Sequence, residues 1–215
     1  KRIRADAAGV ARAGQRHVHQ AVQQRPHALA AQVHLDADRA AFAQLERRDA
    51  LARLADDRLL AGDSDIGLIP VAMIASMKEY HIISEYCLST LGEVRTVLLV
   101  SNTPFDEVRK IFLDYRSRSS VTLCRILAAK AWKRDFEWLP APEDFNITAM
   151  SRGEAAVMIG DRCFEYAKCF SHKTDLGLEW KKFTGLPFVF ACWVSSAPLP
   201  EKFITLFNKA LKEGI

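Results

Sequence analysis

The sequence lacks any apolar run of the roughly 18–20 residues that a membrane-spanning helix needs. The longest apolar stretches, around residues 66–74 and 188–194, have the length of buried strands. The chain starts Lys1-Arg2-Ile3-Arg4, and no apolar core of a secretory signal follows. We therefore expect a cytoplasmic protein with no membrane partner.

Cysteine is scarce, and its spacing suits neither a disulfide framework nor a zinc site. The count is odd and no pair has CxxC spacing. Cys169-x-x-His172 resembles half of a zinc site, but no second half follows. We expect structural thiols in a reducing compartment and no bound metal. The five cysteines are Cys87, Cys124, Cys163, Cys169 and Cys192.

Several catalytic and cofactor-binding motifs are also missing. There is no Walker A loop and no GxGxxG, so the sequence does not support a phosphate or dinucleotide cofactor. There is no HExxH and no nucleophile elbow, and His81 and His172 are the only histidines after residue 62. We expect a protein that works without a cofactor.

The composition changes sharply near residue 62. Residues 1–62 hold 17 Ala, 10 Arg and all six Gln, but no Ser, Thr or Asn. Their 11 Lys+Arg against 7 Asp+Glu account for the whole net charge of +4. The rest of the chain is therefore neutral overall, and a basic protein that binds nucleic acid is not indicated.

Three explanations of residues 1–62 are open. An Ala-rich helical region is one, because apolar residues in 41–60 partly follow helical spacing. A basic nucleic-acid arm is a second, disfavoured because charges of both signs are mixed and Phe42 is the only aromatic residue. The third, which we favour, is a reading-frame error, since a shifted frame in a GC-rich gene tends to yield Ala and Arg.

After residue 62, strand patterns alternate with helix patterns. The alternation predicts an α/β fold with mixed, mostly parallel sheets flanked by helices. A further helix is expected after Thr103 as N-cap, with Pro104 as its first residue. Strands are expected at 65–71, 95–100, 136–139, 155–160 and 187–194, and helices at 121–131, 147–152, 178–184 and 200–211.

The most informative polar cluster is Ser117-Arg118-Ser119-Ser120, at a predicted strand-to-helix junction. The start of a helix offers unpaired N–H groups that favour an anion, and serine hydroxyls add donors. Simple capping of the helix by Ser119, with Arg118 in solvent, explains the same pattern. Both interpretations are open on spacing alone.

Two further clusters are candidates for a binding site. Gly160-Asp161-Arg162 follows a buried strand, and the ends of strands in open α/β sheets face the ligand crevice. Asp161 could orient a hydroxyl or act as a base, or it could simply pair with Arg162. Ser89-Thr90-Leu91-Gly92 would, by itself, be a polar turn.

Taken together, these segments resemble the chorismate dehydratase family of the futalosine route to menaquinone. The resemblance covers about residues 59–215, and residues 1–58 do not match, since they lack the asparagine-bearing loop with which the family opens. It rests on six segments in register: 65–71, 81–87, 92–97, 113–121, 159–162 and 185–190.

The resemblance implies a two-lobed fold like that of the type II periplasmic binding proteins, with lobes closing over a ligand. Lobe one would comprise residues 1–94 and 191–215, and lobe two residues 95–190, with crossings near Val94–Thr96 and Phe188–Cys192. Asp161 would be the catalytic residue, although a carboxylate of the substrate is an equally open candidate for the general base. Five residues would bind the dicarboxylate substrate, chorismate: Ser89, Thr90, Ser119, Ser120 and Gly160.

The implied activity is a carbon–oxygen lyase reaction that converts chorismate to 3-[(1-carboxyvinyl)oxy]benzoate. Two alternatives stay open. One is a protein that binds a small anion without turning it over, and the other is an inactive family member with a defective first lobe.

Overall fold

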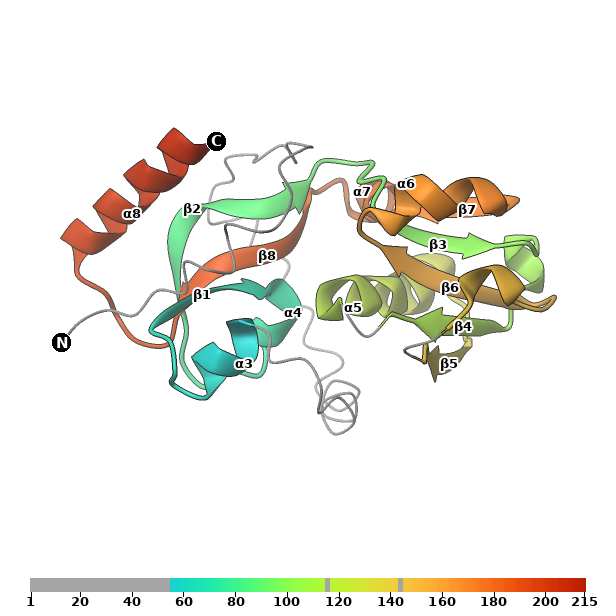
Figure 1. Cartoon of the computed structure of the whole chain (residues 1–215), viewed down its shortest axis with the longest axis horizontal. Coiled ribbons are helices and arrows are strands. Elements are labelled where there is room, and N and C mark those ends of the chain that lie inside the picture. The colour runs from blue at the N-terminus through green and yellow to red at the C-terminus, as the bar shows by residue number, and fades with distance from the viewer. Residues whose placement is uncertain (1–54, 115–116, 143–144) are drawn as a thin grey trace. The chain divides into compact units, whose positions relative to one another are not determined.

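A computed structural model describes residues 55–114, 117–142 and 145–215 (Figure 1). The chain divides into two compact units. Unit 1 contains the described residues up to Ser89 together with Val189–Ile215, and unit 2 is Thr90–Phe188. The chain thus passes from one unit to the other after Ser89 and after Phe188.

Unit 1 is built on a three-stranded sheet of order β1-β8-β2. β1 and β8 are antiparallel, with Leu68 opposite Trp193. The part of the predicted helix 41–60 that precedes residue 55 lies outside the described residues. The elements of this unit are α3 (Ala55–Leu60), β1 (Ile66–Pro70), α4 (Val71–Ile74), β2 (His81–Thr90), β8 (Phe188–Ser195) and α8 (Glu201–Gly214).

The C-terminal helix α8 is attached to β2 and β8 by one amide and one ring. Asn208 Nδ2 donates to the Ile83 carbonyl at 3.0 Å, and Asn208 Oδ1 accepts from the Ser84 hydroxyl at 2.8 Å. The ring of Phe207 packs edge-on against Trp193 of β8, with centroids 5.0 Å apart. These contacts satisfy the polar groups of Asn208 and attach the helix to both strands.

Unit 2 is built on a five-stranded sheet of order β5-β4-β6-β3-β7 (Figure 1). Helices α5 and α7 pack against each other and contact β6 and β3 respectively. Its strands are β3 (Val97–Ser101), β4 (Lys110–Leu113), β5 (Glu137–Pro140), β6 (Glu154–Ile159) and β7 (His172–Asp175). Its α-helices are α5 (Arg118–Ile126), α6 (Arg162–Tyr166) and α7 (Leu176–Thr184). A π-helix, η2 (Leu127–Trp132), continues α5, and the 3-10 turns are η1 (Phe105–Glu107), η3 (Ile147–Ala149) and η4 (Ala167–Cys169).

The core of unit 2 follows strand alternation. Leu98 and Val100 of β3 lie on the same face as Ala156 and Met158 of β6, and these four pack with Cys163 of α6. The intervening residues of the same strands point to the opposite face. Both faces are therefore apolar, as expected of a sheet covered by helices.

The sheets are mixed, which confirms the predicted α/β fold class. β4 is parallel to both β5 and β6. β3 is antiparallel to both β6 and β7, and β1 is antiparallel to β8. The predicted majority of parallel pairs is not seen among these five pairings, because β3 enters its sheet in the opposite direction to its neighbours.

The helix predicted to start at Thr103 and Pro104 is only a 3-10 turn, Phe105–Glu107, and Thr103 does not cap it. The Thr103 hydroxyl instead accepts a hydrogen bond from the Gly153 N–H at 2.9 Å. The chain has no room for a longer helix here, because β4 begins at Lys110 and pairs with strands on both sides.

The five cysteines form no disulfide, and three of them, Cys124, Cys163 and Cys192, are buried. Burial raises the pKa of each of these three thiols to about 12. A raised pKa leaves almost no thiolate near pH 8, whereas Cys169 is exposed. We expect a thiol reagent at pH 8 to label Cys169 rapidly and these three only after denaturation. Loss of the rapid phase in Cys169→Ser would be the control, and rapid labelling of Cys124 would contradict the fold.

Candidate functional site

Two of the predicted polar clusters lie at one edge of the five-stranded sheet. β4 and β6 are parallel neighbours, with Ile111 opposite Ala155, so both strands end on the same side. Asp114 and α5 follow β4, and Gly160, Asp161 and Arg162 follow β6. We call the edge formed by Asp114, the first turn of α5 and residues 160–162 the carboxyl edge. In open α/β sheets this is the side on which ligands bind.

The first turn of α5 is capped by Ser117, not by Ser119. Ser117 has extended backbone angles, and its Oγ accepts from the Ser120 N–H at 3.3 Å. Because the cap is two residues earlier than predicted, Ser119 and Ser120 lie inside the first turn and are 3% and 1% exposed. The interpretation in which Ser119 caps the helix is therefore wrong.

The hydroxyl groups of Ser117 and Ser120 also contact each other, at 2.7 Å. One hydroxyl proton occupies that contact, whichever residue donates it. The other proton has no acceptor among the described residues. A buried hydroxyl normally finds an acceptor, so this pair is suited to donate to an anion.

Gly160 and Asp161 are exposed at the end of β6. Gly160 needs to be glycine because its φ is +70°, while a Cβ there would meet no atom within 4 Å. The Gly160 N–H donates to the Thr96 carbonyl at 2.9 Å and so is already paired. No hydrogen bond or ion pair joins the Asp161 carboxylate to another described residue, which leaves it accessible to a ligand.

Arg162 pairs with Asp114 across the carboxyl edge. The distance from Arg162 Nη1 to Asp114 Oδ2 is 4.0 Å, and the side chains are 38% and 8% exposed. The alternative that Arg162 pairs with Asp161 is therefore wrong. Sequence reasoning missed Asp114, although a polar residue directly after a buried strand is a usable signal.

Ser89 and Thr90 are the last two residues of β2, so the predicted turn is partly strand. The Ser89 hydroxyl is buried and bonds to no oxygen or nitrogen of the described residues. Its polar neighbour is the Cys87 thiol, whose pKa is raised by burial and partly lowered again by Ser89. Ser89 belongs to unit 1, whereas Thr90 is the first residue of unit 2.

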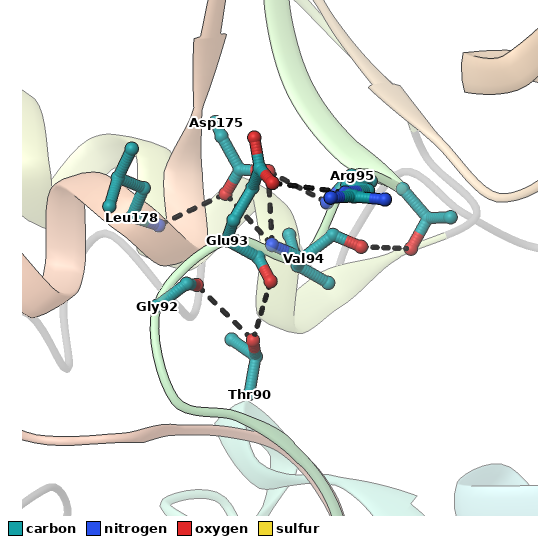
Figure 2. Close-up of polar contacts among 8 residues, drawn as sticks. Thr90, Gly92, Glu93, Val94, Arg95, Asp175 and Leu178 are labelled. Carbon is teal, nitrogen blue, oxygen red and sulfur yellow. Dashed lines mark hydrogen bonds and ion pairs between the residues drawn. The ribbon is translucent and has the colours of Figure 1, made fainter. Parts of the chain in front are cut away.

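The Thr90 hydroxyl lies over its own loop (Figure 2). It donates to the carbonyls of Gly92 at 3.2 Å and Glu93 at 3.1 Å. A threonine has a single hydroxyl proton, so Thr90 in this arrangement can offer a ligand only an acceptor. Donation to a substrate carboxylate would require Thr90 to leave the loop.

The loop after Thr90 is held by Asp175, the last residue of β7 (Figure 2). Its carboxylate accepts from the N–H groups of Val94 at 3.0 Å, Arg95 at 2.7 Å and Leu178 at 3.0 Å. The last of these bonds caps α7. Arg95 has a φ of +63°, an unusual angle for a non-glycine residue, and its N–H bond to Asp175 helps to hold it.

Metal-binding clusters and membrane-spanning helices are both absent from the part of the chain that the structure describes. No group of three or more His, Cys, Asp or Glu side chains lies close enough there to hold a metal ion. Over the same residues, no helix combines the length and the apolar character needed to cross a membrane.

Comparison with known proteins gives a family match and a fold match. A family model described as menaquinone biosynthesis matches residues 33–215. The crystal structure of protein AF1704 from Archaeoglobus fulgidus is similar, with a TM-score of 0.52 and 18% identity. An ABC transporter structure from Parabacteroides distasonis aligns with a TM-score of 0.46 and 20% identity, over 80% of this chain and 66% of that chain.

The matches differ in how much of each chain they cover. The alignment with AF1704 covers 74% of this chain but 59% of that chain. This likeness shows that the two proteins share a fold over the aligned residues. The family match starts at residue 33, earlier than residue 59, where the sequence resemblance was expected to begin. A match over residues 33–58 counts against a shifted reading frame there.

Proposed function

Because the chain belongs to the menaquinone biosynthesis family, we propose that it is a chorismate dehydratase. The reaction would remove water from chorismate and form 3-[(1-carboxyvinyl)oxy]benzoate. The observation that carries the proposal is the hydroxyl pair of half-buried Ser117 and buried Ser120, which has one proton without an acceptor among the described residues. A carboxylate oxygen of the substrate would supply that acceptor.

The chemistry needs few groups from the protein. The C3–H bond breaks, its electron pair forms the new ring double bond, and the C4 hydroxyl leaves, so that the proton and the hydroxyl together make water. The ring becomes aromatic, which supplies the driving force. The C3 position is conjugated to the C1 carboxylate, so donors at that carboxylate stabilise the negative charge that develops in the transition state.

The residues of the carboxyl edge divide these tasks. Ser119 and Ser120 would bind the ring carboxylate at the start of α5. Gly160 would line the ring pocket, and the exposed Asp161 would lie beside the reacting carbon as the proposed base. Ser89 and Thr90 stay predicted substrate contacts.

The test is to incubate the purified full chain with chorismate and follow the products by chromatography. We expect a peak of 3-[(1-carboxyvinyl)oxy]benzoate that grows with protein concentration and is absent from a heat-inactivated sample. Retention of unchanged chorismate would instead identify a small-anion binding protein. If chorismate is neither converted nor retained, both functions are overturned and the chain is an inactive family member.

We expect Ser120→Ala to weaken binding by about 1 kcal/mol or more, at least roughly fivefold, because one hydrogen bond to a charged group is lost. Titration calorimetry with the reaction product, which cannot react further, measures the effect. Ser101→Ala is a matched control, since Ser101 is also buried in unit 2 but donates to the Glu154 carbonyl. An unchanged dissociation constant for Ser120→Ala would reduce the serine cluster to a helix cap.

A further inference from the structure

We infer that Arg162 binds the ring carboxylate of the substrate together with the first turn of α5, and that Asp114 positions its guanidinium. The inference rests on the proposed function and adds the residue that would select for a charged ring substituent. It depends on two neighbouring strand ends that the sequence places 48 positions apart, residues 114 and 162. The parallel pairing of β4 and β6 brings them to the same edge.

Burial is unequal in the Asp114–Arg162 pair. The Asp114 side chain is 8% exposed and the Arg162 side chain 38%. The Asp114 carboxylate lies beside the Arg162 guanidinium and so favours its position at the carboxyl edge. At 4.0 Å the contact is an ion pair rather than a close hydrogen bond, and it leaves most of the guanidinium donors uncommitted.

The uncommitted donors are suited to a carboxylate. No other hydrogen bond or ion pair joins Arg162 to a described residue. A guanidinium presents parallel N–H groups in one plane, which match the two oxygens of a carboxylate. The structure thus combines a fixed positive charge with donors that are open to solvent, whereas a purely structural arginine would direct its donors at carbonyl groups. Arg134, which donates to the carbonyls of Asp106 and Val108 at 3.0 Å, is such an arginine.

The position of the pair ties it to α5. The Asp114 carbonyl accepts from the Ser117 N–H at 3.3 Å, so the acid lies directly before the helix start. The Ser117–Ser120 hydroxyl pair follows within the first turn. Guanidinium, hydroxyl and the positive end of the helix therefore act on the same small region, and an anion bound there would receive donors from both strand ends.

The matched variant for Arg162→Gln is Arg152→Gln. Arg152 lies just before β6 as Arg162 lies just after it, and it pairs with Glu107 at 2.7 Å on the exposed surface. Both variants remove one guanidinium from unit 2 and one ion pair. A difference in ligand binding between the two variants therefore reports the place of Arg162 at the carboxyl edge and not the loss of a positive charge alone.

The experiment uses the full chain and two ligands, 3-[(1-carboxyvinyl)oxy]benzoate and its ring carboxamide. The dissociation constant of the carboxamide divided by that of the carboxylate reports how strongly the protein prefers a charged ring substituent. We expect Arg162→Gln to reduce this ratio at least tenfold and Arg152→Gln to leave it within twofold of the original chain. Partial unfolding would lower the active fraction for both ligands alike, so it would not change the ratio.

Asp114→Asn tests the positioning role with the same ratio. We expect a smaller fall than for Arg162→Gln, because the guanidinium is still present but no longer held. An unchanged ratio in Arg162→Gln, with the product still bound, would overturn the inference and leave the proposed function intact. Failure of the original chain to bind the product at all would overturn both.

Discussion

Replacing Asp175 by alanine is expected to lower the free energy of unfolding by about 3 kcal/mol. The carboxylate accepts from three backbone N–H groups, those of Val94, Arg95 and Leu178. Each hydrogen bond to a charged group is worth roughly 1.5–3 kcal/mol, and loss of a helix N-cap alone costs about 1 kcal/mol. We expect a value well below the sum of the three bonds. Asp175 is only half-buried, so water can replace the carboxylate at part of the N–H groups that the substitution leaves without an acceptor.

Urea unfolding of the original chain and of Asp175→Ala measures the difference, with the same dependence of the free energy of unfolding on urea concentration used for both. Asp161→Ala is the matched control, since Asp161 also holds the N-cap position of a helix but its side chain makes no capping bond. We expect Asp161→Ala to change the free energy of unfolding by less than about 0.5 kcal/mol. Equal losses in the two variants would show that the Asp175 bonds contribute nothing specific.

Asp175 links the loop after Thr90 to the rest of unit 2. It fixes Val94 and Arg95 just before β3 begins, and the loop that it holds starts at Thr90. β7 reaches the carboxyl edge because it is antiparallel to β3, with Leu98 opposite Asp175. The residue therefore positions a loop and caps α7 at the same place where β4 and β6 end.

The sequence was most informative where the signal is local. Continuous apolar runs located β1, β3, β6 and β8 within a few positions, and the periodic helix after residue 120 is present as α5. Each of these elements is specified by its own side chains, which must face the core or solvent wherever the element lies. Turn and cap positions were less well located, as shown by Thr103 and by the shift of the α5 cap to Ser117.

The contacts that make the carboxyl edge could not be read from the sequence. The Asp114–Arg162 pair depends on β4 and β6 being neighbours, and strand order is not encoded in either segment alone. Asp175 could have been predicted from the sequence, because an aspartate before an apolar periodic run is a typical N-cap. It was missed because the predicted helix began at Leu178, two residues after the true start at Leu176.

Replacing Gly177 by alanine is expected to lower the free energy of unfolding by about 2 kcal/mol, although alanine ordinarily favours a helix over glycine by up to about 1 kcal/mol. Gly177 is the second residue of α7, and a Cβ there would lie 2.6 Å from the Gly92 carbonyl oxygen and 2.8 Å from Thr90 Cγ2. The carbonyl belongs to the backbone, so it cannot rotate away as a side chain could. Overpacking of this kind typically costs about 1–3 kcal/mol beyond any propensity gain.

The same unfolding measurement applied to Gly214→Ala provides the control for the glycine. Gly214 is the last residue of α8, and a Cβ there would meet nothing within 4 Å. We expect Gly214→Ala to be neutral or slightly stabilising, so only Gly177→Ala should lower the free energy of unfolding. A Gly177→Ala chain as stable as the original would mean that α7 does not approach the Thr90 loop so closely. The arrangement that Asp175 holds on the other side of that loop would then also need revision.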